Sequence, residues 1–378
     1  MNKRLTKTLG EVCEFHSGLW KGKKPPYVHV GVIRNTNFTK DGRLDEDDIA
    51  FLDVELKQFD NKKLKFGDII LEKSGGGPKQ PVGRVIIFEK TKGQYSFSNF
   101  TSAVRVKDQN ELNYKYLQKY LWFLHSSGIT EKMQKHSTGI RNLQMKEYKE
   151  VVIPLPSLPE QKRLVSILDE AFAAIEKAKE NAKKNLQNAQ EIFESCRKST
   201  FADGGKRWIK TKIGEQIKLQ RGFDITKKQQ RSGKVPVVSS GGIKSFHDTA
   251  MAKAPGVVIG RKGTLGKVFY LENDFWPHDT TLWVKEFKEN NPRFVYHFLM
   301  SLDVAVLNSG TANPALNRNL VHSLEVLWPP LDLQTEIVSK FDILVSETKK
   351  LQSLYTQKLS ALDELKQSLL KKAFSGEL

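Results

Sequence analysis

A stretch of this chain from Pro156 to Phe201 occurs a second time at its end, and the two copies align without a gap. Both copies follow prolines, which favour extended chain just before them, and both continue as apolar heptads. They predict two helices of roughly 40 residues, each about 60 Å long, which would need a partner along their length. Identical pairs include Gln161 and Gln334, Asp169 and Asp342, Leu186 and Leu359, Glu191 and Glu364, and Phe201 and Phe374.

The heptads predict that the two helices pack against each other. The expected seam is Leu168, Ala171, Ile175, Ala178, Ala182, Ala189, Ile192 and Cys196 in the first copy, and Phe341, Leu344, Thr348, Leu351, Tyr355, Leu362, Leu365 and Leu369 in the second. Each copy lacks an apolar residue at one slot, Asn185 and Lys358. Antiparallel pairing about a pseudo-twofold axis places Ala182 against Tyr355, so that small residues meet large ones. The alternative is two unrelated, exposed amphipathic helices.

The remaining segments are mixed and β-rich, and they repeat more faintly. Leu9-Gly10-Glu11 with Gly18 matches Ile213-Gly214-Glu215 with Gly222. Their short runs of Val, Ile and Phe between turn residues predict strands, and each segment ends in a helical stretch. We therefore expect an α+β fold: domains at 1–155 and 204–329, separated by long antiparallel helices at 156–203 and 330–378.

The charge of the chain favours a polyanionic partner. Lys and Arg number 61 against 43 Asp and Glu, a net charge of +18, which suits nucleic acid or an anionic membrane. The basic residues are spread through loops rather than along an amphipathic helix, which disfavours a membrane surface. No run is apolar enough for a membrane span and no signal sequence follows Met1, so we expect a cytoplasmic protein with Cys13 and Cys196 reduced.

The sequence offers little for catalysis. The glycines near Gly263 and Gly266 do not have the spacing of a phosphate loop, and Val268 stands where Ser or Thr would bind magnesium. The Asn-Pro-Pro-aromatic motif of amino-methyltransferases is missing. Asp48, Glu55 and Lys57 have the composition of a nuclease metal site, but a solvated acidic surface explains them better. His278 beside Asp279 suits either a base with its orienting carboxylate or a hydrogen-bonded loop pair.

Taken together, these features resemble the specificity (S) subunit of type I restriction-modification enzymes along the whole chain. The resemblance is carried by Ile153-Pro154-Leu155-Pro156-Ser157-Leu158-Pro159-Glu160-Gln161 before the first helix and by Lys371-Lys372-Ala373-Phe374-Ser375-Gly376-Glu377-Leu378 at the end. Residues 326–334 resemble the first motif, with Leu333 in place of the glutamate.

The resemblance implies two target recognition domains, each reading one half of a split, asymmetric DNA sequence, with helical spacers between them. It also implies two methyltransferase subunits that bring S-adenosylmethionine and methylate adenine, and restriction subunits that use ATP and Mg. The chain itself is then non-catalytic and holds no cofactor or metal. Its partners are double-stranded DNA and these subunits.

DNA reading requires Arg, Lys, Asn or Gln on loops that reach a groove or a phosphate. In the first domain we expect these contacts from Lys21, Lys23, Lys24, Lys73, Lys79, Arg84, Asn99, Arg141 and Asn142. In the second domain we expect them from Arg221, Lys227, Lys228, Arg231, Arg261, Lys262, Lys267, His278, Asn317 and Arg318.

Two other functions remain open at this point. One is a stand-alone DNA-binding regulator or architectural protein, which would bind a specific sequence tightly without a methyltransferase partner. The other is a fused nuclease or methyltransferase fragment, which would transfer methyl groups as a pure chain. Co-purification with a methyltransferase would favour the specificity subunit.

Overall fold

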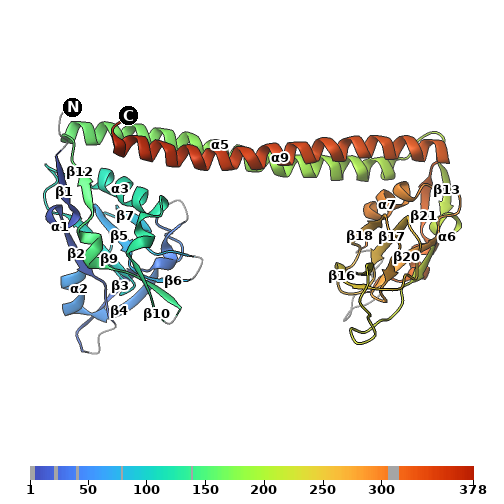
Figure 1. The fold of residues 1–378 in the computed structure, drawn as a ribbon, viewed down its shortest axis with the longest axis horizontal. Coiled ribbons are helices and arrows are strands. Elements are labelled where there is room, and N and C mark those ends of the chain that lie inside the picture. The colour runs from blue at the N-terminus through green and yellow to red at the C-terminus, as the bar shows by residue number, and fades with distance from the viewer. Residues whose placement is uncertain (1–4, 21–23, 40–41, 78–79, 138, 305–314) are drawn as a thin grey trace. The chain divides into compact units, whose positions relative to one another are not determined.

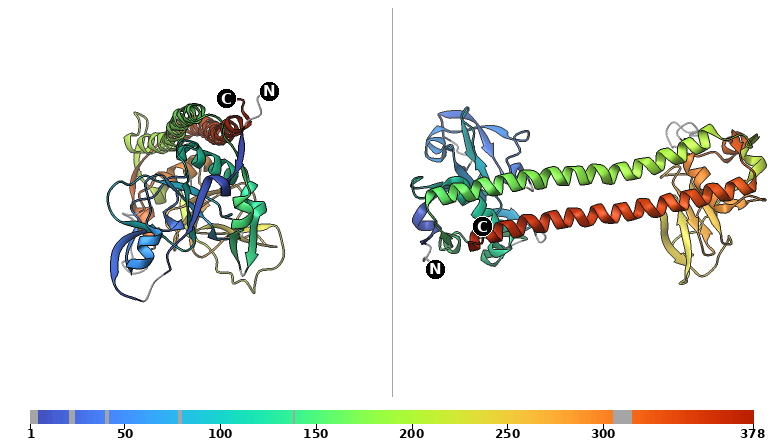
Figure 2. Two further views of the ribbon diagram at one scale, coloured as in Figure 1. Left: turned by 90° about the vertical axis from the view of Figure 1, so that its left-hand side faces the viewer. Right: turned by 90° about the horizontal axis from the view of Figure 1, so that it is seen from above.

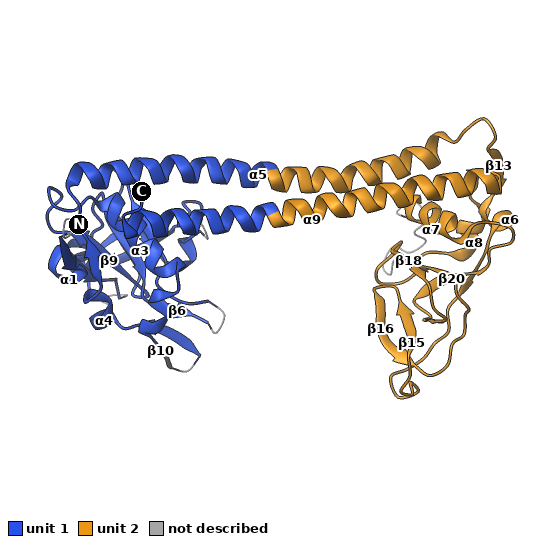
Figure 3. Ribbon diagram, turned by 45° about the horizontal axis from the view of Figure 1, so that its top comes forward, with its two compact units in different colours: residues 1–181, 358–378 blue, residues 182–357 orange. Residues whose placement is uncertain are grey.

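The computed structural model describes residues 5–20, 24–39, 42–77, 80–137, 139–304 and 315–378 (Figure 1). The chain forms two compact units, one of residues 1–181 with 358–378 and the other of residues 182–357 (Figure 3). Each unit contains one globular domain together with part of both long helices, α5 (Leu158–Asp203) and α9 (Leu331–Ser375). The two long helices predicted from the repeat are therefore confirmed.

The domain of unit 1 is built around a four-stranded antiparallel sheet of order β2-β9-β5-β7. Two three-stranded sheets, β4-β3-β8 and β10-β11-β6, and the pair β1-β12 complete it. Its elements are β1 (Thr6–Thr8), α1 (Leu9–Val12), β2 (Cys13–Ser17), β3 (Tyr27–Ile33), β4 (Ala50–Glu55), α2 (Leu56–Lys62), β5 (Asp68–Glu72), β6 (Ser74–Gly76), β7 (Val85–Phe88), β8 (Tyr95–Phe97), β9 (Thr101–Val106), α3 (Tyr114–Ser126), β10 (Gln134–Ser137), β11 (Ile140–Leu143), α4 (Met145–Lys149) and β12 (Val152–Pro154), with short 3₁₀ helices at Asn35–Asn37 and Ile129–Met133.

Unit 2 repeats this topology except for the sheet β10-β11-β6, which has no counterpart among the described residues of unit 2. Its four-stranded sheet has the order β14-β20-β17-β18, and β16-β15-β19 matches β4-β3-β8 down to the parallel outer pair. Its elements are β13 (Ile209–Lys212), α6 (Ile213–Gln216), β14 (Lys218–Arg221), β15 (Val235–Ser239), β16 (Gly242–His247), β17 (Gly256–Gly260), β18 (Val268–Leu271), β19 (Trp276–Pro277), β20 (Thr281–Glu286), α7 (Pro292–Ser301), α8 (Arg318–Ser323) and β21 (Glu325–Trp328). The expected pair of mixed, β-rich domains is confirmed.

The repeated glycines of the sequence serve one purpose in both domains. A Cβ on Gly18 would lie 1.8 Å from the carbonyl oxygen of Ser98, and one on Gly222 would lie 2.2 Å from that of His278. Any side chain at these positions would collide with the neighbouring backbone. The glycine after β2 and after β14 therefore lets the chain pass close to the turn that precedes β9 or β20.

A buried glutamine joins the start of each long helix to its domain. Gln161 of α5 accepts a hydrogen bond from the Asn113 N–H (2.8 Å) and donates to the carbonyls of Glu111 (2.8 Å) and Pro156 (2.9 Å). Gln334 of α9 likewise accepts from the Asn291 N–H (2.9 Å). Asn113 and Asn291 are the N-caps of α3 and α7, so the identity of the two glutamines has the same structural cause in both copies.

A phenylalanine, buried in α9 and half-buried in α5, joins the end of each long helix to a domain. Phe374 of α9 packs on Tyr120 of α3, with ring centroids 5.0 Å apart. Phe201 of α5 packs on Phe294 and Phe298 of α7, at 5.5 Å from each. Each domain is thus held by the beginning of one long helix and the end of the other.

In both units α5 and α9 lie side by side (Figure 2) and run antiparallel. In unit 1, Lys366 of α9 pairs with Glu176 of α5 at 3.2 Å, Asp363 pairs with Lys179, and Arg163 donates to the carbonyl of Leu378 at 2.9 Å. In unit 2, Phe193 of α5 packs against Phe341 of α9 at 6.2 Å. Partners late in one helix are early in the other, as antiparallel pairing requires.

The seam differs from the expectation at three of the predicted positions. Leu168, Ile175, Ala182, Ala189 and Phe341 are buried, and Cys196, Thr348, Tyr355, Leu362 and Leu369 are half-buried. Ala171, Ala178 and Leu344 are also half-buried, and the seam takes in the residue after each alternate position as well: Phe172, Lys179, Leu186 and Phe193 in α5 and Val345, Gln352, Leu359 and Lys366 in α9. Ile192, Leu351 and Leu365 are exposed, so their assignment to the seam was wrong.

The corrected stripe also explains the apparent gaps. Leu186 and Leu359 fill the slots that seemed vacant at Asn185 and Lys358. Lysines are tolerated in the stripe because their aliphatic stems pack while their charges are paired. The Lys366 ammonium lies 4.4 Å from the centre of the Trp122 ring, next to Glu176. Among the described residues, no helix has both the length and the apolar character needed to cross a lipid bilayer.

Replacing Gln161 with leucine should destabilise unit 1 by about 2–4 kcal/mol, because the Asn113 N–H and two carbonyls would be buried without partners. The free energy of unfolding from denaturant titration measures this loss. The control is Gln187→Leu on the exposed part of the same helix, where the side chain of Gln187 bonds Glu191 (2.6 Å) and no other described residue. Its effect should stay within about 0.5 kcal/mol. Equal effects of the two variants would contradict the role given to Gln161.

Unit 2 should lose stability in acid because of His297. Its ring lies 4.9 Å from that of Phe341, and burial together with Arg197 lowers the His297 pKa to about 4. Since the unfolded chain binds this proton near pH 6.5, stability falls as the pH drops from 6.5 towards 4. Between pH 7 and pH 4.5 the wild type should lose about 2–3 kcal/mol more than His297→Phe. The wild-type pH dependence in His297→Phe would refute the assignment.

Candidate nucleic-acid interface

The two domains build the same edge at the end of their central strand. In unit 2 the N–H groups of Arg261 and Lys262, which follow β17, both donate to the carbonyl of Thr280 (2.8 and 3.0 Å). In unit 1 the N–H groups of Lys73 and Ser74, which follow β5, both donate to the carbonyl of Phe100 (3.0 and 3.1 Å). The equivalence found in the sequence is therefore an equivalence of backbone hydrogen bonds.

In unit 2 this edge gathers several of the predicted DNA-contacting residues. Arg221, Arg261, Asn317 and Arg318 line one shallow pocket, at the ends of β14 and β17 and the start of α8. Arg221 pairs with Asp279 at 2.9 Å, which positions its guanidinium. Burial and the neighbouring Arg221 lower the pKa of Arg261. Asp279 compensates only part of the charge of these three arginines, and such a group suits the oxygens of a phosphate or a guanine edge.

The other predicted residues of unit 2 lie on several loops. Lys227, Lys228, Lys262 and Lys267 are exposed, and His278 is half-buried in the turn before β20. Arg231 makes a two-pronged ion pair with Asp248 (2.5 and 3.0 Å), which lowers the pKa of Asp248 to about 2. Arg231 is thus occupied within the domain, whereas the lysines are free of ion pairs among the described residues.

In unit 1 the same edge carries different side chains. Lys73 follows β5, Asn142 accepts a 2.6 Å hydrogen bond from Ser74 on the neighbouring strand, and Asn99 is half-buried in the turn before Phe100. Arg141 is mostly buried and lies 3.6 Å from Glu131. Lys24 is exposed. Lys21, Lys23 and Lys79 lie outside the described residues.

Arg84 requires a correction, because it is part of the interior. Its guanidinium makes two 2.8 Å bonds to the buried Glu72 and donates to the carbonyls of Phe38 (3.0 Å) and Asn35 (3.1 Å). A second buried pair, Arg105 with Asp68 at 2.7 Å, closes the other end of β5. The corresponding ends of β17 are Gly256 and Gly260, which cannot form ion pairs. The two buried ion pairs at the ends of the central strand are therefore found in unit 1 and not in unit 2.

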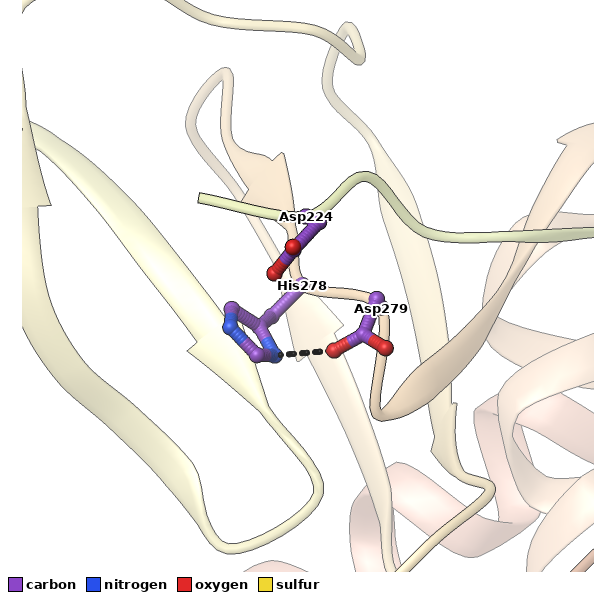
Figure 4. A group of neighbouring side chains, drawn as sticks. All are labelled: Asp224, His278 and Asp279. Carbon is purple, nitrogen blue, oxygen red and sulfur yellow. Dashed lines mark ion pairs between the residues drawn. The ribbon is translucent and has the colours of Figure 1, made fainter. Parts of the chain in front are cut away.

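The carboxylates do not assemble the nuclease-like site considered from the sequence. Asp48 pairs with Arg34 at 3.2 Å, and the only group of three potential metal ligands among the described residues is Asp224, His278 and Asp279 (Figure 4). There the His278 Nδ1 lies 3.1 Å from both Asp279 and Thr280. Arg221 already pairs with Asp279. The hydrogen-bonded loop pair therefore describes His278 and Asp279 better than a catalytic base.

Two residues near the edge of unit 1 escaped the sequence analysis. Trp20 is 68 % exposed, and Lys62 donates from Nζ to the carbonyl of Gly18 (2.8 Å). The position of Trp20 beside Lys21, Lys23 and Lys24 could have drawn notice, since aromatic residues within basic loops are typical of nucleic-acid contacts. Lys62 gave no such indication, because only the fold brings α2 to Gly18.

The family model and the relatives that match this chain share one description. Residues 3–184 and 205–357 match the family model of the type I restriction modification DNA specificity domain. The type I restriction enzyme StySPI specificity subunit of Salmonella potsdam is 23% identical, covering 93% of this chain and 82% of the relative. The EcoKI specificity subunit of Escherichia coli K12 is 22% identical with the same coverage.

Solved structures agree on the fold. A chain from work on complex assembly and conformational transition of the type I R-M system superposes with a TM-score of 0.80 at 14% identity, over 100% of this chain and 99% of that one. The HsdS subunit from Thermoanaerobacter tengcongensis gives 0.65 at 15% identity, over 99% and 97%. The family model covers both domains of this chain, which therefore belongs to the family of type I restriction-modification DNA specificity subunits.

Proposed function

We propose that each domain of this specificity subunit binds one half of a bipartite, asymmetric sequence in double-stranded DNA. The observation that supports this is that the two domains share one backbone arrangement but carry different side chains at the equivalent edge. Where unit 2 has Arg221, Arg261 and Arg318, the hydrogen-bond pattern of unit 1 places Ser17, Lys73 and Met145. Equal frames with unequal side chains are suited to reading two different words.

The long helices supply the link between the two half-sites. Both α5 and α9 contribute residues to both units, and a continuous helix is a stiffer spacer than a loop. We infer that they set the number of unread base pairs between the two words. They also dock two methyltransferase subunits, and the exposed apolar residues Ile192, Ile343 and Leu354 in unit 2 offer contact area for such partners.

The chemistry of the complex belongs to the partners in this proposal. The specificity subunit is non-catalytic and binds no cofactor of its own. S-adenosylmethionine is brought by the methyltransferase subunits, and ATP with Mg by restriction subunits that join the complex. The DNA interface described above needs only positive charge, hydrogen-bond donors and shape.

Removing Arg261 and Lys262 together, by alanine substitution, should weaken DNA binding and flatten its salt dependence. Each lost phosphate contact lowers the slope of log K against log salt by about 0.9, so the slope should fall by about 1.8. Binding of the full chain to a fluorescein-labelled duplex over a series of salt concentrations measures this. The control Lys183→Ala with Lys184→Ala removes the same charge from exposed positions of α5 and should keep the slope. An unchanged slope in the Arg261 and Lys262 variant would remove both residues from the interface.

Shortening both helices by one heptad should shorten the unread gap. Deleting residues 183–189 of α5 and 349–355 of α9 keeps the heptad phase and removes about 10 Å, or about 3 base pairs. Mapping methylated adenines in a host that carries the assembled methyltransferase reads the gap and both words. Substituting Lys183 and Lys184 by glutamine, without a change of length, is the control. Identical gaps in the deletion variant and the control would contradict the helices as the spacer.

A further inference from the structure

We propose that Lys62 and Lys73 together bind the DNA backbone through a phosphate of the half-site read by unit 1, with Trp20 contacting the adjoining nucleotide. This assignment rests on the proposed function and specifies how unit 1, which lacks the arginine cluster of unit 2, holds its DNA. Lys62 is half-buried and donates to one backbone carbonyl, and Trp20 is exposed.

The turn from Gly18 to Trp20 is fixed at its base and free at its tip. The Leu19 N–H donates to the carbonyl of Phe97 (2.8 Å), and the Leu19 side chain is buried. The backbone N–H of Trp20 donates to Oε1 of Gln58 on α2 (3.3 Å). Trp20 as a residue nevertheless remains 68 % exposed, the largest fraction among the exposed large apolar residues described. A rigid backbone that presents an exposed indole loses little entropy on binding.

Lys62 comes to this turn from the end of α2. Its Nζ donates to the carbonyl of Gly18 at 2.8 Å, which uses one of the three donors of the ammonium group. Lys73 follows β5 and lies on the other side of the turn Ser98–Phe100. The backbone N–H of Lys73 donates to the carbonyl of Phe100 in this turn. Gly18 packs directly on the Ser98 carbonyl, so this one turn brings the two lysines together.

The charges of the two lysines are uncompensated. Neither makes an ion pair with a carboxylate among the described residues. Burial lowers the pKa of Lys62, and burial followed by the repulsion of Lys62 lowers the pKa of Lys73. Two ammonium groups held within range of each other repel, and an anion between them relieves that repulsion. A DNA phosphate is the anion that the proposed function supplies.

The comparison with unit 2 indicates why an aromatic residue stands here. The bridges Leu19–Ser98 and Phe223–His278 occupy equivalent places, so Trp20 corresponds to Asp224. Unit 2 therefore has a carboxylate and an arginine cluster where unit 1 has an indole and two lysines. Tryptophan beside lysine can pack on a sugar or a base while the ammonium holds the phosphate.

Lys62→Gln tests the phosphate contact, because glutamine retains a donor for the Gly18 carbonyl but carries no charge. With the full chain and the labelled duplex, the slope of log K against log salt should fall by about 0.9. Lys62→Arg should restore the slope. Lys63→Ala removes a neighbouring exposed charge on the same segment and should leave the slope at its wild-type value. Thermal unfolding of each variant establishes that it is folded.

Trp20→Ala should weaken binding about fivefold or more at a single salt concentration and leave the salt slope unchanged, since no charge is lost. Trp20→Phe should recover part of the affinity. A Lys62→Gln variant with the wild-type slope would overturn the phosphate contact, and a Trp20→Ala variant with the wild-type affinity would overturn the nucleotide contact. Neither result touches the proposed function, which the Arg261 and Lys262 variant tests separately. If the wild-type protein showed no salt-dependent DNA binding, the proposed function and this assignment would both be overturned.

Discussion

The structure depends on the burial of two helices that are too long to stand alone. α5 has 46 residues and α9 has 45, and each presents a narrow stripe that is only partly apolar. The stripe is covered by the other helix, and the ends are covered by the domains through Gln161, Gln334, Phe201 and Phe374. Folding of a domain and pairing of the helices therefore stabilise each other within each unit.

The same frame holds two different recognition edges. The backbone bonds that fix Lys73 and Arg261 are equivalent, yet unit 1 closes its central strand with Asp68–Arg105 and Glu72–Arg84. Buried ion pairs of this kind cost desolvation and depend on good geometry. These ion pairs occur in only one of the two domains. The two domains therefore differ in their interiors as well as at their edges, while their contacts to the long helices are the same.

The large features of the fold were predictable from the sequence, because a gapless repeat and heptad spacing depend only on residue order. The failures came from neighbours that the sequence does not reveal. The seam was predicted wrongly at Ile192 because the neighbouring Phe193 takes that slot instead. Arg84 was taken for a surface donor because nothing in the sequence shows that Glu72 is buried beside it. Basic residues could be counted, but their convergence into the Arg221, Arg261 and Arg318 pocket required the fold.

The glutamine contact has a consequence for how such proteins can change. Gln161 and Gln334 recognise only a backbone N–H at an asparagine-capped helix and nearby carbonyls, groups that almost any sequence can present. A foreign domain could replace either of the two domains if it kept that capped helix and an aromatic surface for Phe201 or Phe374. New DNA specificities could then arise by exchange of whole domains, without changes in the long helices α5 and α9 to which the domains attach.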